Sequence, residues 1–208
     1  MSNSNTTLIQ TGLAGLGYSP GPVDGFFGAR TKAAATAWLA AEGRPAGAIL
    51  PAETTAMIFQ GKARYPVREI ALHCSATRSD WMASSGLAAQ RAEIRRWHMQ
   101  DNGWRDIAYH WLLGRGGDIL AGRPETEIGA GIMGHNNGVI HICLIGGHGA
   151  SERDPFARHF TSQQNISLRQ LLQGIGMRTQ ISLISGHNQY APKACPGFTV
   201  SEWLKEAA

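Results

Sequence analysis

The spacing of apolar residues changes once along the chain, near residue 66, and this change constrains the fold more than any other feature. Before it, apolar residues recur at helical spacing, as at Leu8, Ile9, Leu13 and Leu16. After it, short strand-like runs alternate with segments of helical spacing. We therefore expect a small helical domain over residues 1–62, a linker over 63–67, and a second, larger domain over 68–208.

Three helices are expected in the first domain, over residues 6–16, 31–41 and 52–59. The loop from Tyr18 to Gly28 separates the first two, because its glycines and prolines cannot continue a helix. A unit of about 60 residues is marginally stable by itself.

The second domain is expected to be α/β (α+β), with a mixed central β-sheet flanked by helices. Residues 70–75, 107–113 and 180–184 read as strands, and the nearly continuous apolar run 139–145 is typical of a sheet centre. A hairpin is expected to return the chain through residues 119–122. Helices are expected over residues 92–100, from a capping box of Thr161 and Gln164, and after Thr199.

Composition excludes several classes of protein. With 43% hydrophobic and 16% charged residues, the chain can bury a core. The net charge of +4 is compatible with a polyanionic substrate, but without a run of Lys or Arg it does not indicate nucleic acid as a partner. We see no secretory signal and no apolar stretch of roughly 18 residues, so we expect a cytoplasmic protein without membrane insertion. Three cysteines do not make a disulfide framework.

A candidate metal site lies in two segments that are distant in the sequence. His73 comes at the end of an expected strand, His187 follows the last strand, and Cys195 lies eight positions later. Two imidazoles and one thiolate form a three-ligand zinc set that leaves the fourth tetrahedral position for water. The spacing alone is weak evidence, but the lack of a fourth nearby ligand favours a catalytic over a structural site.

The second domain resembles the amidase-type lysozymes of bacteriophages and, more distantly, the peptidoglycan recognition proteins. The matching strings are HCSAT at 73–77, IRRWH at 94–98, GWRDIAYHW at 103–111, CLIGG at 143–147 and HNQYAPKACPGF at 187–198. The resemblance implies N-acetylmuramoyl-L-alanine amidase activity, with Zn²⁺ on His73, His187 and Cys195. It also implies that Tyr109 and Lys193 serve the reaction. Substrate contacts are expected from His98, His110 and Asn136.

The sequence departs from these relatives just before the central strand. They usually carry Gly-x-His and then Ser-Ile-Gly in this segment. Here glycine occupies the usual histidine place, and histidines lie instead at His135 and His141. We expect this wall of the groove to contact substrate differently.

The first domain resembles the small peptidoglycan-binding domain that is often fused to wall hydrolases. The resemblance rests on Leu-Gly-Tyr18, the segment from Pro22 to Gly28, and Thr31 with its Ala-rich helix. It implies wall contacts from Asp24, Gly25 and Phe26. Asp-Gly also builds tight turns routinely, so a purely structural role is an equal alternative for that pair.

Two other functions are compatible with the same residues. A non-catalytic module that recognises muropeptides would need no turnover, although Cys195 argues against it. A cysteine hydrolase would use Cys195 as nucleophile and His187 as base, without metal. For the amidase, the missing export signal together with a wall substrate suggests a phage or prophage endolysin that stays in the cytoplasm until a pore-forming partner, a holin, opens the membrane. We expect it to be a monomer.

Overall fold

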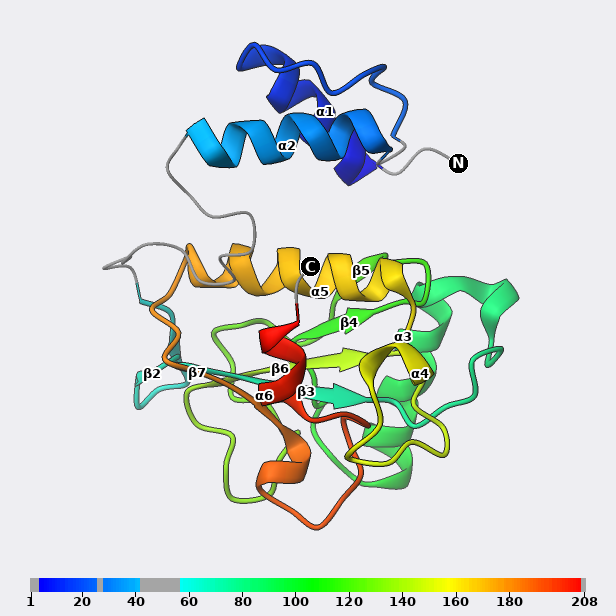
Figure 1. The fold of residues 1–208 in the computed structure, drawn as a ribbon. Coiled ribbons are helices and arrows are strands. Elements are labelled where there is room, and N and C mark those ends of the chain that lie inside the picture. Colours follow the sequence, from blue (N-terminus) through cyan, green and yellow to red (C-terminus); the bar gives the residue numbers. More distant parts are fainter. Residues whose placement is uncertain (1–3, 26–27, 42–56, 207–208) are drawn as a thin grey trace. The chain divides into compact units, whose positions relative to one another are not determined.

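A computed structural model describes residues 4–25, 28–41 and 57–206 of the 208-residue chain (Figure 1). The chain divides into two compact units, Met1–Ala48 and Ile49–Ala208. Within the described ranges, no helix combines the length and apolar character that crossing a bilayer requires.

The first unit contains α1 (Ser4–Gly15) and α2 (Ala29–Ala41), joined by the glycine- and proline-rich loop. Leu13 and Ala34 are buried between them. The buried Gln10 side chain holds the loop: its amide donates to Asp24 Oδ1 at 3.0 Å and to Thr31 Oγ1 at 3.2 Å, and its oxygen accepts from Gly25 N. The first two helices are therefore confirmed. Residues 52–56 of the expected third helix lie outside the described residues, and Phe59 belongs to a strand.

The second unit is built on a five-stranded mixed sheet in the order β5-β4-β6-β3-β7. These strands are β3 (Glu69–Cys74), β4 (Trp111–Leu113), β5 (Ile119–Ala121), β6 (Val139–Leu144) and β7 (Leu183–Gly186). β6 is the middle strand, as its continuous apolar run predicts. It pairs in parallel with β3 and β4, β3 pairs in parallel with β7, and only β5 is antiparallel. The expected mixed sheet and its hairpin are confirmed.

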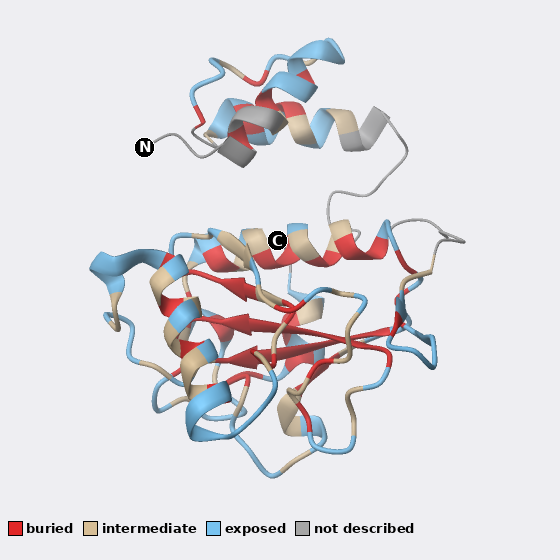
Figure 2. Ribbon diagram, turned by 180° about the vertical axis from the view of Figure 1, so that it is seen from behind, coloured by how far each residue is buried: buried red, intermediate tan, exposed pale blue. Residues whose placement is uncertain are grey.

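The two faces of this sheet are covered differently. On one face, Ile70, Leu72 and Ile142 pack against α5 (Ser162–Gly176), α6 (Val200–Lys205) and the short α4 (Phe156–His159), in one large apolar core. On the other, α3 (Gly86–Arg96) continues into a π-helical turn (Trp97–Asp101) and buries Leu87 and Ile94. β3 and β6 are buried along their whole length, and Figure 2 shows the long strands of the sheet in red and exposed residues on the helices of this unit.

Some boundaries differ from those expected. Residues 57–67 are part of the second unit, because β1 (Phe59–Gln60) and β2 (Tyr65–Pro66) form a hairpin whose buried Gln60 side chain bonds Val139 O and Gly138 N. The second unit therefore starts earlier than the boundary expected from the sequence, and residues 63–67 are no free linker.

Two local predictions were wrong in detail. The expected strand 107–113 is regular only from Trp111, because the His141 main-chain N–H donates to the His110 imidazole rather than to a carbonyl, which interrupts the ladder. Thr161 caps α5 through the expected box with Gln164, but the Thr199 hydroxyl donates to Glu152 O instead of capping α6.

Candidate metal centre

Three side chains from distant segments meet at the ends of two neighbouring strands. His73 lies in β3, His187 begins a 3-10 turn (His187–Gln189) directly after β7, and Cys195 lies in the following loop. Leu72 pairs with Gly186, so the parallel register brings the next residues, His73 and His187, side by side. One ligand atom from each of His73, His187 and Cys195 lies within 4.8 Å of the other two. The expected ligand set is therefore assembled in space.

The two nitrogens of His73 face different partners. Nδ1 lies 3.8 Å from Cys195 Sγ, on the side of the ligand cluster. Nε2 lies 3.0 Å from Nδ1 of His141. A histidine that ligates a metal usually has its second nitrogen held in this way, because the hydrogen bond fixes the ring orientation and tautomer.

The electrostatics of the cluster suit a cation ligated by neutral imidazoles. Burial lowers the pKa of His73 well below its ordinary value, and His187 and Lys193 lower it further. Burial and Lys193 also lower the pKa of His187. Both rings are therefore neutral near pH 7, which is the form that donates a lone pair to a metal.

Cys195 contributes the sulfur atom of the cluster. Its Sγ accepts a hydrogen bond from Cys74 N at 3.3 Å, a contact that favours a thiolate. Without a cation, however, the neighbouring Cys74 thiol and burial raise the pKa of Cys195 above its ordinary value. A nucleophilic cysteine needs a lowered pKa. The half-buried thiol is therefore not activated by its protein surroundings, and the donor set of two imidazoles and one thiolate fits Zn²⁺.

Tyr109 and Lys193 lie beside this cluster. The Tyr109 ring centroid is 5.2 Å from that of His73, and burial raises the pKa of the Tyr109 phenol, which keeps its proton at neutral pH. Lys193 is exposed in the loop between His187 and Cys195, close enough to act electrostatically on both histidines. Both residues are thus located where a reaction at the cluster would occur.

The three expected substrate contacts have different surroundings. His98 is buried and stacks on Trp104 at 4.8 Å, while its Nδ1 accepts from Ala108 N. His110 is completely buried, and its two ring nitrogens bond the main chain at His141 N and Glu127 O, so it cannot touch a polymer. The half-buried Asn136 accepts from Ile132 N and shapes its own loop. The prediction of substrate contact is wrong for His110. Its buried imidazole accepts from the His141 main-chain N–H, in the place where a neighbouring strand would offer a carbonyl oxygen.

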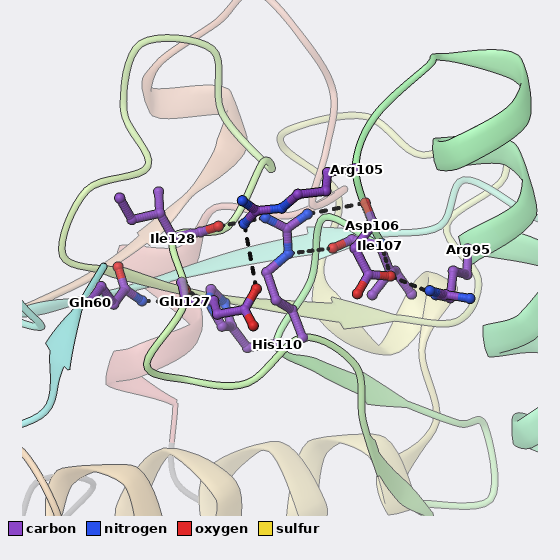
Figure 3. A network of polar contacts seen from close by, with 9 residues as sticks. Gln60, Arg95, Arg105, Asp106, Ile107, His110, Glu127 and Ile128 are labelled. Atoms are coloured by element: carbon purple, nitrogen blue, oxygen red, sulfur yellow. Dashed lines mark hydrogen bonds and ion pairs between the residues drawn. The ribbon is translucent and has the colours of Figure 1, made fainter. Parts of the chain in front are cut away.

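A buried arginine fixes the segment that carries Tyr109. The Arg123 guanidinium donates to the main-chain oxygens of Asp106, Ile107 and Ile128, and Arg95 pairs with the Asp106 carboxylate (Figure 3). The backbone around residues 106–107 is not paired in a β-sheet, and the Arg123 and Arg95 side chains hold it in place. Sequence patterns did not indicate this role for Arg123.

A second polar cluster was also missed from the sequence. The buried Glu69 carboxylate accepts from Ser185 Oγ at 2.5 Å and Tyr190 Oη at 2.6 Å, and it pairs with His135 Nε2 at 2.7 Å. The His135 ring stacks on Tyr190 at 4.1 Å. Because Tyr190 ends the turn that begins at His187, this cluster ties the ligand loop to the sheet.

In the first unit, Asp24 and Gly25 build a turn. Both bond the buried Gln10 side chain, and Gly25 has a φ of 75°, which favours glycine. Phe26 lies outside the described residues.

Comparison with known proteins agrees with this geometry. Residues 63–198 match the family described as N-acetylmuramoyl-L-alanine amidase. The chain belongs to that family. Residues 2–45 match a peptidoglycan binding domain, so this amidase carries the first unit as a second family module.

Individual relatives match more than two thirds of the chain. The endolysin of Enterobacteria phage T3 is 37% identical over 147 residues, which are 71% of this chain and 91% of the relative. The endolysin of Escherichia phage T7 is 36% identical with the same coverage. Among solved structures, the amidase LysC from Clostridium intestinale URNW has a TM-score of 0.55 at 22% identity, covering 75% of this chain and 93% of that one. The last likeness shows the fold alone.

Proposed function

We propose that the chain is a zinc-dependent endolysin that hydrolyses the amide between the lactyl group of N-acetylmuramic acid and L-alanine of the stem peptide. The observation that carries the proposal is the convergence of His73, His187 and Cys195 within a domain of the amidase family. When bound there, Zn²⁺ would polarise the amide carbonyl and lower the pKa of a water ligand to about 7.

The chain supplies two further groups to this reaction. The Lys193 ammonium would stabilise the negative charge that develops on the carbonyl oxygen, an effect worth about 3–4 kcal/mol in comparable sites. The Tyr109 hydroxyl, protonated at neutral pH, would orient the attacking water through a hydrogen bond. His98 and Asn136 remain proposed contacts to the polymer.

The first unit is proposed to hold the enzyme on the wall. The match of residues 2–45 to a peptidoglycan binding domain supports this role, with Asp24, Gly25 and Phe26 as the proposed contact segment. We further propose that the enzyme acts as a monomer and reaches the wall from the cytoplasm after a holin opens the membrane.

The test is the chemistry of the products released from purified peptidoglycan. We expect stem peptides with a free L-alanine amine, identified by mass spectrometry, and no release after metal removal until zinc is restored. Lys193→Ala should lower kcat by roughly 10²- to 10³-fold while zinc stays bound. Release by metal-free protein that thiol alkylation then blocks would instead establish the cysteine hydrolase.

Separate outcomes identify the non-catalytic alternative. Wall pelleting without any stem-peptide release by the zinc-loaded protein would show a recognition module. If Cys195→Ser abolishes release but not pelleting, the enzyme and its wall anchor are both supported.

A further inference from the structure

The segment 129–131 and β6 bring an unassigned histidine against a proposed zinc ligand. His141 is completely buried, and its Nδ1 lies 3.0 Å from Nε2 of His73. His141 also stacks on His110, with ring centroids 5.7 Å apart and planes 13° apart. The ring of His141 is thus fixed on one side by His110 and meets His73 on the other.

Two glycines leave space for this imidazole. A Cβ at residue 131 would lie 2.7 Å from His141 Nδ1 and 2.9 Å from His73 Nε2. A Cβ at residue 129 would lie 2.4 Å from His141 Cδ2. All three distances are shorter than van der Waals contact, so Gly129 and Gly131 are needed for the His73–His141 contact. The departure seen in the sequence, with glycine at 131 and histidine at 141, therefore has one spatial explanation.

The direction of the hydrogen bond follows from the ligand cluster. Nδ1 of His73 faces Cys195 Sγ, so a metal ligated by His73 would take the Nδ1 lone pair. A neutral imidazole then carries its proton on Nε2. Nε2–H of His73 donates to Nδ1 of His141, and His141 carries its own proton on Nε2.

This assignment leaves one buried donor unsatisfied. His141 Nε2 is the buried side-chain nitrogen or oxygen that has no hydrogen-bond partner among the described residues. Such a group destabilises the folded protein, and native proteins retain few of them. The loss of stability from the unsatisfied Nε2–H is explained if the other ring nitrogen of His141, Nδ1, is needed as the acceptor for His73.

We propose that His141 is a positioning residue that holds His73 as an Nδ1 zinc ligand by accepting a hydrogen bond from its Nε2–H group. This inference rests on the proposed function, because it requires that His73 binds zinc. Replacing the hydrogen-bond partner of a metal-ligating histidine typically weakens metal binding by about 10- to 100-fold.

The test compares two substitutions at one position. His141→Asn keeps an acceptor atom where Nδ1 lies, whereas His141→Leu fills similar volume without an acceptor. We expect His141→Leu to raise the zinc dissociation constant by about 10- to 100-fold, measured by competition with a chromophoric chelator. His141→Asn should restore most of that affinity. Melting temperatures of the zinc-free variants would separate stability from metal binding.

A steric variant tests the same contact from the other side. Gly131→Ala inserts a methyl group between the two rings and should also weaken zinc binding. The matched control is Gly174→Ala in α5, where an added Cβ meets nothing within 4 Å and zinc affinity should not change.

The outcomes separate this inference from the proposed function. Equal zinc affinity for His141→Leu and the unsubstituted protein would overturn the inference alone. Failure of the unsubstituted protein to bind zinc would overturn the proposed function and this inference with it. Should the leucine variant not fold, ¹⁵N NMR of the unsubstituted, metal-free protein decides: an Nε2–H tautomer of His73 supports the inference, and an Nδ1–H tautomer overturns it.

Discussion

The two faces of the central sheet use the same strands for opposite purposes. From β3, Ile70 and Leu72 enter a continuous apolar core beneath α5 and α6, whereas Glu69 and His73 enter a face of hydrogen-bonded polar groups. From β6, Ile142 and His141 divide in the same way. Because side chains alternate along a strand, one face of the sheet stabilises the domain, while the other holds buried histidines that lower its stability but are held in a fixed arrangement.

The largest expected effect tests whether the polar face binds metal. Structural zinc sites with four protein ligands bind the metal with about 10–16 kcal/mol, which is about 2.5–4 kcal/mol per ligand, so Cys195→Ser should cost about 3 kcal/mol, on the order of a hundredfold in affinity. Chelator competition measures this. Cys143→Ala, on the same face but outside the ligand cluster, is the control and should bind zinc normally.

A substitution on the apolar face should lower the free energy of unfolding and leave zinc affinity unchanged. Leu168 in α5 is completely buried, and Leu168→Ala should lower the free energy of unfolding by about 3 kcal/mol through a cavity. Zinc affinity of the folded protein should not change. Ile166→Ala, at an exposed position of the same helix, is the control for denaturant unfolding. A strong loss of zinc affinity in Leu168→Ala would contradict the division between the faces.

Acid should destabilise the polar face specifically. Burial lowers the pKa of His110 to about 4, below the unfolded value of about 6.5, so the folded state binds fewer protons between these values. Stability is therefore fully present above pH 6.5 and falls as the pH drops towards 4, by about 1.4 kcal/mol per pH unit for this residue. Denaturant unfolding of zinc-free protein at several pH values measures the slope.

The control for this prediction replaces the titrating ring. His110→Gln can keep both main-chain contacts but cannot take up a proton, so its stability should depend less steeply on pH. Burial also lowers the pKa of His98 to about 4, so part of the slope should remain in that variant. An unchanged slope in His110→Gln would contradict the assignment.

The smallest expected effect concerns the helix that covers the apolar face. Thr161→Ala removes the capping bond to Gln164 N and should cost about 1 kcal/mol of unfolding free energy. Thr199→Ala is the comparison variant, because it removes an exposed hydrogen bond to Glu152 O but no helix cap. Zinc affinity should be equal in both variants.

Sequence patterns predicted the apolar face better than the polar one. Period-two alternation located β3, a nearly continuous apolar run located β6, and the Thr161–Gln164 box located the start of α5, because these features are local. The ligands could be named because their types are chemically distinctive. The contact between His141 and His73 depends on strand register and on two glycines 10 and 12 residues before His141, which no local pattern reports. The β1–β2 hairpin was missed because its anchor, Gln60, bonds residues some 80 positions away.

X-ray absorption at the zinc edge tests the central claim most directly. For protein loaded with one equivalent of zinc, we predict one sulfur at about 2.3 Å and two imidazole nitrogens at about 2.0–2.1 Å, with a further light atom completing the shell. The sulfur should disappear in Cys195→Ser. A shell without sulfur in the unsubstituted protein, or one closed by four protein ligands, would contradict the account.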